Sequence, residues 1–111
     1  MVYRVRILPG ALQDARNYYE FIATYSPETA VTWFEGLFEV VDSLSTMPKR
    51  CPIAPETALI GLEIRCLVYQ KFYRILYSID EDIVRIYHIR HTSQEFMSSE
   101  DFSVYQDRRN P

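Results

Sequence analysis

The side chains best suited to acid–base or anion chemistry lie in the second half of the chain. Imidazole titrates close to neutral pH, so His91 is a candidate general acid or base. Arg65, Lys71 and Arg90 carry positive charge that can hold an anion such as phosphate. A lone histidine at a strand end is also commonly a hydrogen-bonding corner residue, and that alternative for His91 stays open. His88 alternates with Arg90 on one face of a strand, where we expect it to pack at the edge of the core.

The charge balance argues against a broad nucleic-acid-binding surface. Lys and Arg total 12 against 15 Asp and Glu, giving a net charge of −3. Phosphate binding over a large area needs clustered cations, and residues 62–97 are only neutral. A local cationic site remains possible.

Other site chemistries find little support. Asp80, Glu81 and Asp82 form an acidic turn without the ligand spacing of a calcium loop. Cys51 and Cys66 are too few for a zinc site, and we expect both thiols to pack as small apolar groups without a disulfide. We therefore expect no metal and no cofactor. The N-terminal residues lack the pattern of a signal peptide and no run of 18 apolar residues occurs, so we expect a cytoplasmic protein without membrane contact.

Hydrophobic periodicity predicts one strand followed by two helices. Residues 3–7 alternate as a half-buried strand, and Pro9-Gly10 is expected to end it. Residues 11–24 repeat apolar side chains at intervals of three and four, as an amphipathic helix does. Ser26-Pro27-Glu28 is a strong start for a second helix, running to about residue 46. The short connection predicts an antiparallel helical hairpin.

Three strands are predicted after an irregular, proline-containing stretch that reaches about residue 60. The strands cover residues 62–69, 72–79 and 83–90, and short turns join them into an antiparallel meander. The fold class is therefore α+β, with the helical hairpin on one face of the sheet. Residues 1–95 form the predicted domain, and residues 96–111 form a polar C-terminal tail that we expect to order against a partner.

Aromatic residues are concentrated on the two helices. Their helical spacing indicates packing within the hairpin, with outward rings left for a partner protein. The candidate partner-binding residues are Tyr18, Tyr25, Trp33 and Tyr77, together with Arg74, whose alternative role is to anchor the sheet.

Six segments in order make the chain resemble the RelE/ParE toxin family, also called plasmid stabilisation proteins. They are a first strand, Tyr25-Ser26-Pro27, a Phe-containing helix closing on Leu44 and Pro48, Gly61-Leu62-Glu63-Ile64-Arg65, Tyr73-Arg74-Ile75-Leu76-Tyr77, and Ile86-Tyr87-His88-Ile89-Arg90-His91. The resemblance spans roughly residues 3–95. It implies the toxin half of a bacterial type II toxin–antitoxin module, silenced by an antitoxin that wraps the hairpin and the sheet.

Within this family the resemblance implies two activities. One branch is similar to RelE and cuts messenger RNA on the ribosome, without a metal, mainly with Lys and Arg on the sheet. Here those roles would fall to Arg65, Lys71, Arg90 and His91. The other branch is similar to ParE and blocks DNA gyrase. Many members follow the histidine with Gly and Arg, whereas this chain has residues Thr92 to Glu95, which cannot offset phosphate charge.

The departure at residues 92–95 favours a gyrase-blocking toxin over a ribosome-dependent endoribonuclease. A third hypothesis is a toxin-fold binding module that has lost its toxicity. Whether the chain forms a homodimer or a toxin–antitoxin hetero-oligomer stays open. All three hypotheses share one geometric expectation: two helices pack against a curved sheet and leave an uncovered groove lined by guanidinium and imidazole groups.

Overall fold

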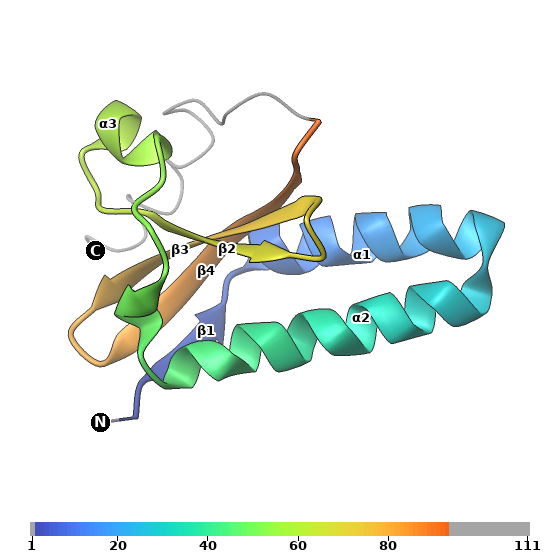
Figure 1. Cartoon of the computed structure of the whole chain (residues 1–111), viewed down its shortest axis with the longest axis horizontal. Coiled ribbons are helices and arrows are strands. Elements are labelled where there is room, and N and C mark those ends of the chain that lie inside the picture. The colour runs from blue at the N-terminus through green and yellow to red at the C-terminus, as the bar shows by residue number, and fades with distance from the viewer. Residues whose placement is uncertain (1, 94–111) are drawn as a thin grey trace.

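The computed structural model describes residues 2–93. Two long helices lie against one face of a four-stranded sheet, and a short helix lies on the opposite side (Figure 1). The predicted α+β class is therefore confirmed. The predicted domain boundary at residue 95 and the tail of residues 96–111 lie outside the described residues. In the part of the chain that is described, no helix is long and apolar enough to cross a membrane.

The sheet has the strand order β1-β4-β3-β2. Its strands are β1 (Arg4–Ile7), β2 (Arg65–Tyr69), β3 (Tyr73–Asp80) and β4 (Ile83–His91). The last three form the predicted antiparallel meander, while β1 pairs with β4 in parallel. Parallel neighbours require a long connection, and here the whole segment from α1 to β3 lies between β1 and β4 in the sequence. The sheet is therefore mixed, with β1 and β2 at its edges.

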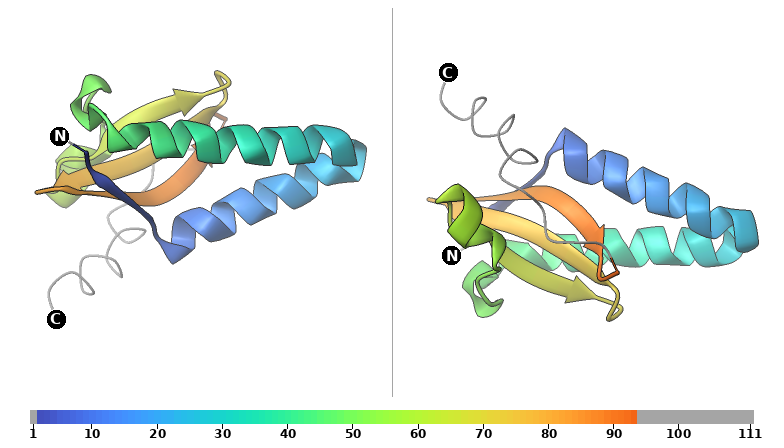
Figure 2. Two further views of the ribbon diagram at one scale, coloured as in Figure 1. Left: turned by 90° about the horizontal axis from the view of Figure 1, so that it is seen from below. Right: turned by 90° about the horizontal axis from the view of Figure 1, so that it is seen from above.

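The helical hairpin consists of α1 (Pro9–Tyr25) and α2 (Pro27–Asp42). The Ser26 hydroxyl accepts a hydrogen bond from the Thr29 amide at 3.2 Å, and Pro27 takes the first helical position. Helix α1 begins earlier than predicted because Pro9 opens the helix instead of ending the strand. Helix α2 stops at Asp42, and a 3-10 turn at residues 43–45 completes the predicted span. The tip of the hairpin extends beyond the sheet (Figure 2).

The stretch predicted to be irregular contains a short helix, α3 (Glu56–Ile60), and its later part, with Ala54 and Ile60, packs on the face of the sheet opposite the hairpin. The prediction that β2 starts at Leu62 is wrong, because regular strand pairing begins at Arg65. Gly61 ends α3 in the left-handed region at φ 69°, which glycine adopts without strain. Ala54 and Ile64 form a small second core with Cys66, Leu76 and Tyr87.

The main core lies between the hairpin and the sheet. Its fully buried members include Leu37 and Leu44 from the helical side and Ile75, Tyr77 and Ile86 from the strands. Burying an aliphatic side chain of this size contributes about 1.5–3 kcal/mol, so this interface is the main source of stability.

A β-bulge changes the direction of β4 near its middle. Leu76 pairs with His88 while Tyr77 pairs with Ile86, so Tyr87 is an extra residue on β4. Beyond this point β1 has ended, and α1 runs beside the uncovered edge of β4. The bulge thereby separates the half of β4 that is paired with β1 from the half that faces α1.

Candidate functional site

Arg74 is held by a buried carboxylate from α3. Its two terminal nitrogens donate to the two oxygens of Glu56, each at 2.9 Å, and the Glu56 side chain is fully buried. The hydrogen bonds to Glu56 raise the pKa of Arg74 above its usual value. This bidentate pair ties α3 to β3 and supports the anchoring role of Arg74. An incoming anion would have to displace a carboxylate that has no access to water.

Arg65 is likewise held by hydrogen bonds to other residues of the domain. Its guanidinium donates to the carbonyl oxygens of Cys51 at 2.7 Å and Lys49 at 3.1 Å, and to the Glu63 carboxylate at 3.1 Å. The side chain is only 16% exposed. Arg65 therefore fastens residues 49–51 to the start of β2.

The other predicted catalytic residues lie at the far end of the sheet and face different ways. Lys71 is exposed in the loop between β2 and β3, which is one residue longer than the predicted two-residue turn. His91 stacks on Phe72 with ring centroids 5.9 Å apart, and its Nδ1 accepts a hydrogen bond from the Ser93 amide at 3.1 Å. Arg90 lies beside Arg74 in the register of the sheet. Because neighbouring residues of a strand point to opposite faces, Arg90 and His91 are on opposite sides.

Arg65 is therefore separated from the other three predicted catalytic residues, which share one end of the sheet. Arg65 pairs with Tyr77 and His91 pairs with Tyr73, which puts them four residues apart along β3. At the usual rise of a strand that separation is about 13 Å.

A contact that the sequence analysis missed joins α1 to the uncovered edge of β4. The Asp14 carboxylate accepts hydrogen bonds from the Ile89 amide at 2.9 Å and contacts His88 Nδ1 at 3.0 Å. The Tyr18 hydroxyl accepts from the His91 amide at 2.9 Å, and burial raises the pKa of Tyr18. Asp14 and Tyr18 are four residues apart on one helical face, but helical periodicity does not indicate which strand they contact. They close this edge to further strand pairing.

Burial corrects the expectation that Trp33 and Tyr77 face a partner. Trp33 is 3% exposed and Tyr77 is fully buried. Tyr77 donates its hydroxyl proton to the Pro48 carbonyl at 2.6 Å, and burial raises its pKa well above the usual value. Both rings belong to the core. Tyr25, in contrast, is 78% exposed at the tip of the hairpin and packs against Phe21, with ring centroids 5.5 Å apart.

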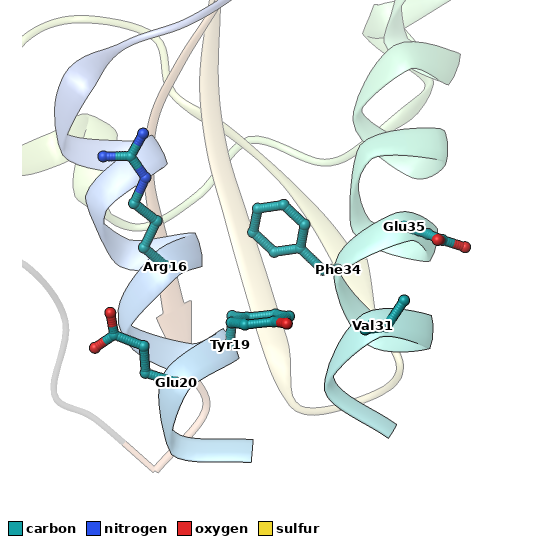
Figure 3. A pocket seen from close by; sticks show the side chains of 6 residues that line it. All are labelled: Arg16, Tyr19, Glu20, Val31, Phe34 and Glu35. Atoms are coloured by element: carbon teal, nitrogen blue, oxygen red, sulfur yellow. The ribbon is translucent and has the colours of Figure 1, made fainter. Parts of the chain in front are cut away.

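A long apolar depression follows the outer side of the hairpin. One hollow of about 420 Å³ lies between α1 and α2, and Figure 3 shows Tyr19 reaching from α1 toward Phe34 of α2, where the two rings pack edge to face with centroids 5.3 Å apart. A second, of about 540 Å³, lies between α2 and the edge strand β1. Phe34 and Glu35 line both hollows, so the two join into one depression, which we call the hairpin groove. Its lining residues are Val5, Ile7, Arg16, Tyr19, Glu20, Val31, Phe34, Glu35, Phe38, Glu39, Val41 and Asp42.

The hairpin groove differs from the groove predicted from the sequence. Its floor is aromatic and aliphatic, and its charged residues are mostly acidic. The guanidinium groups of Arg65, Arg74 and Arg90 and the imidazole of His91 do not line it. The hairpin groove is therefore not the predicted groove, since contacts within the domain direct the Arg65 and Arg74 side chains elsewhere.

The architecture is that of small α+β toxins. The chain aligns with a structure of the chromosomal ParDE toxin–antitoxin system from P. aeruginosa, with a TM-score of 0.66 and 15% identity over 81% of this chain and 96% of that chain. It also aligns with the toxin–antitoxin complex RelBE2 from Mycobacterium tuberculosis, with a TM-score of 0.52 and 25% identity over 82% of this chain and 99% of that one. No curated protein sequence matches significantly.

The family model of the ParE toxin of the type II toxin–antitoxin system parDE matches residues 5–96. The chain therefore belongs to the ParE toxin family, and the resemblance inferred from its sequence segments is confirmed.

Proposed function

We propose that this toxin arrests growth by binding a protein target, DNA gyrase, and that it cuts no RNA. The observation that carries the proposal is the dispersal of residues suited to RNA cleavage: Arg65 lies at one end of the sheet, and Lys71, Arg90 and His91 lie at the other. Arg65 is committed to the carbonyls of residues 49 and 51, and Arg90 and His91 face opposite sides of β4.

The chemistry of RNA cleavage makes this dispersal important. A base must reach the 2′-hydroxyl, an acid must reach the leaving oxygen, and cations must lie beside the same phosphate. These groups must all lie within hydrogen-bond reach of one nucleotide, whereas Arg65 and His91 are on different strands and are offset by about 13 Å along the strand direction. Binding a protein needs no such convergence, and the exposed Phe21 and Tyr25 are typical of protein-binding surfaces.

We further propose that a cognate antitoxin neutralises the toxin by occupying the hairpin groove. Both structural neighbours come from toxin–antitoxin systems. In this chain the groove offers an apolar floor along α2, with Val31 44% exposed. An exposed apolar depression of this length is the usual mark of a partner-binding surface.

The test is induced expression of the chain without its antitoxin, followed by mapping of cellular RNA ends and by a supercoiling assay with purified gyrase. We expect growth arrest, no new cuts inside translated codons, and loss of supercoiling activity. The double variant Arg90→Ala, His91→Ala should arrest growth as the parent does. New cuts within codons that disappear in this variant would establish the ribosome-dependent endoribonuclease instead. Normal growth with full expression would favour the non-toxic binding module.

A further inference from the structure

The hairpin groove has an acidic rim. Its charged lining residues are Glu20, Glu35, Glu39 and Asp42 against a single cation, Arg16, which gives four negative charges and one positive, a net −3. All five residues are exposed. Within the described part of the chain, the structure records no ion pair for any of them. In Figure 3 the carboxylates of Glu20 and Glu35 lie at the margins of the hollow, outside the rings that form its floor.

Three of these carboxylates form one row on α2. Glu35, Glu39 and Asp42 are separated by four and three residues, so they lie one above another on the same helical face. Like charges at this spacing repel. The last turn of α2 contains no basic residue, so Glu39 and Asp42 also face the negative end of the helix dipole. The free toxin therefore holds an unfavourable concentration of negative charge, which a cationic partner would relieve.

The groove has the length of a helix of about three turns. Its lining positions on α2 run from Val31 to Asp42 at steps of three and four residues, a span of about 16 Å at the rise of an α-helix. The floor beneath the rim is continuous through Phe34, with Tyr19 on one side and Phe38 on the other. A groove of this shape accepts the apolar face of an amphipathic helix.

We infer that the occupant of the hairpin groove is an amphipathic helix of the antitoxin that carries Lys or Arg along the flank facing Glu35, Glu39 and Asp42. This inference rests on the proposed neutralisation at the groove and adds the chemistry of the partner. The apolar face supplies most of the affinity, and the cationic flank fixes the direction and register of the helix. An antitoxin segment with an acidic flank would meet three like charges and be rejected.

The experiment compares two synthetic peptides of 14 residues with the same apolar face and with flanks of either Lys or Glu. Each is labelled with fluorescein, and its binding to the full chain is followed by anisotropy at low and high salt. Each exposed ion pair contributes about a twofold change in affinity, so three pairs should make the Lys peptide bind about eightfold more tightly than a neutral-flank peptide. The preference over the Glu peptide should be larger and should shrink in high salt.

Two variants make the test specific. Glu35→Gln, Glu39→Gln, Asp42→Asn removes the charged row while keeping the apolar floor, and it should abolish the preference between the peptides. Glu81→Gln, in the exposed turn between β3 and β4, changes the net charge by one away from the groove and should preserve it. Equal binding of the two peptides to the parent chain, a preference for the Glu peptide, or no binding of either would overturn the inference.

The outcome is separable from that of the proposed function. If the peptides show no charge preference while expression still arrests growth and inhibits gyrase, the inference fails and the gyrase proposal stands. If the Lys peptide binds selectively but growth is unaffected, the groove chemistry stands and the toxin activity fails.

Discussion

Replacing Arg74 by alanine removes the cationic partner of a carboxylate that has no contact with solvent. The Glu56 side chain is fully buried and Arg74 is 15% exposed, with two hydrogen bonds of 2.9 Å between them. Removing one partner of such a pair leaves an uncompensated buried charge, at a cost of about 3–5 kcal/mol. Domains of this size are stable by only about 5–15 kcal/mol, so we expect the melting temperature to fall by more than about 10 °C.

The assay is thermal and urea unfolding followed by far-UV circular dichroism, with expression of each variant to measure growth arrest. Arg74→Lys keeps the charge but cannot reproduce the bidentate geometry, so it should be intermediate in stability. The double variant Arg74→Met, Glu56→Leu replaces the ion pair by apolar groups and should recover most of the loss. If Arg74→Ala costs less than about 1 kcal/mol yet abolishes growth arrest, the anchoring role is refuted and Arg74 acts on the target.

Two further predictions concern the main core. Gly36→Ala places a methyl group against the Tyr69 hydroxyl, which donates to the Trp33 carbonyl at 2.9 Å, so the free energy of unfolding should fall by about 1–3 kcal/mol in urea titrations. Gly36→Ala combined with Tyr69→Phe should recover part of the loss, and no recovery would contradict the proposed clash. Burial raises the pKa of Tyr77 above the ordinary value of 10.0, so the unfolded state loses this phenol proton first. Stability should be constant below about pH 10 and fall above it, less steeply in Tyr77→Phe; equal slopes in circular dichroism would exclude Tyr77 as a cause.

The order and type of the main elements could be predicted from the sequence because they depend on local periodicity and capping. Ser26-Pro27-Glu28 marked the start of α2 correctly, and the alternation of β3 assigned Tyr73, Ile75 and Tyr77 to one face. The short helix α3 was not predicted, because its five residues are too few to show a helical periodicity next to several prolines.

The roles of the charged residues could not be predicted in the same way. An arginine side chain can bind an anion or can hold two structural elements together, and only its contacts distinguish these two roles. Glu56 is 18 residues from Arg74 in sequence, and Lys49 is 16 residues from Arg65, so neither partner was apparent until the segment before β2 folded over the sheet.

By itself, the sequence determined the α+β class, the helical hairpin and the antiparallel meander, since these follow from local periodicity, and the resemblance to a toxin family, which follows from the order of six short segments. Only the tertiary structure decided that β1 pairs in parallel with β4 and that Arg65 and Arg74 are held by hydrogen bonds within the domain. It also decided that the hairpin groove has an acidic rim. The physical reason is that side-chain burial and strand pairing depend on which segments far apart in the sequence come into contact. Local periodicity does not show which segments these are.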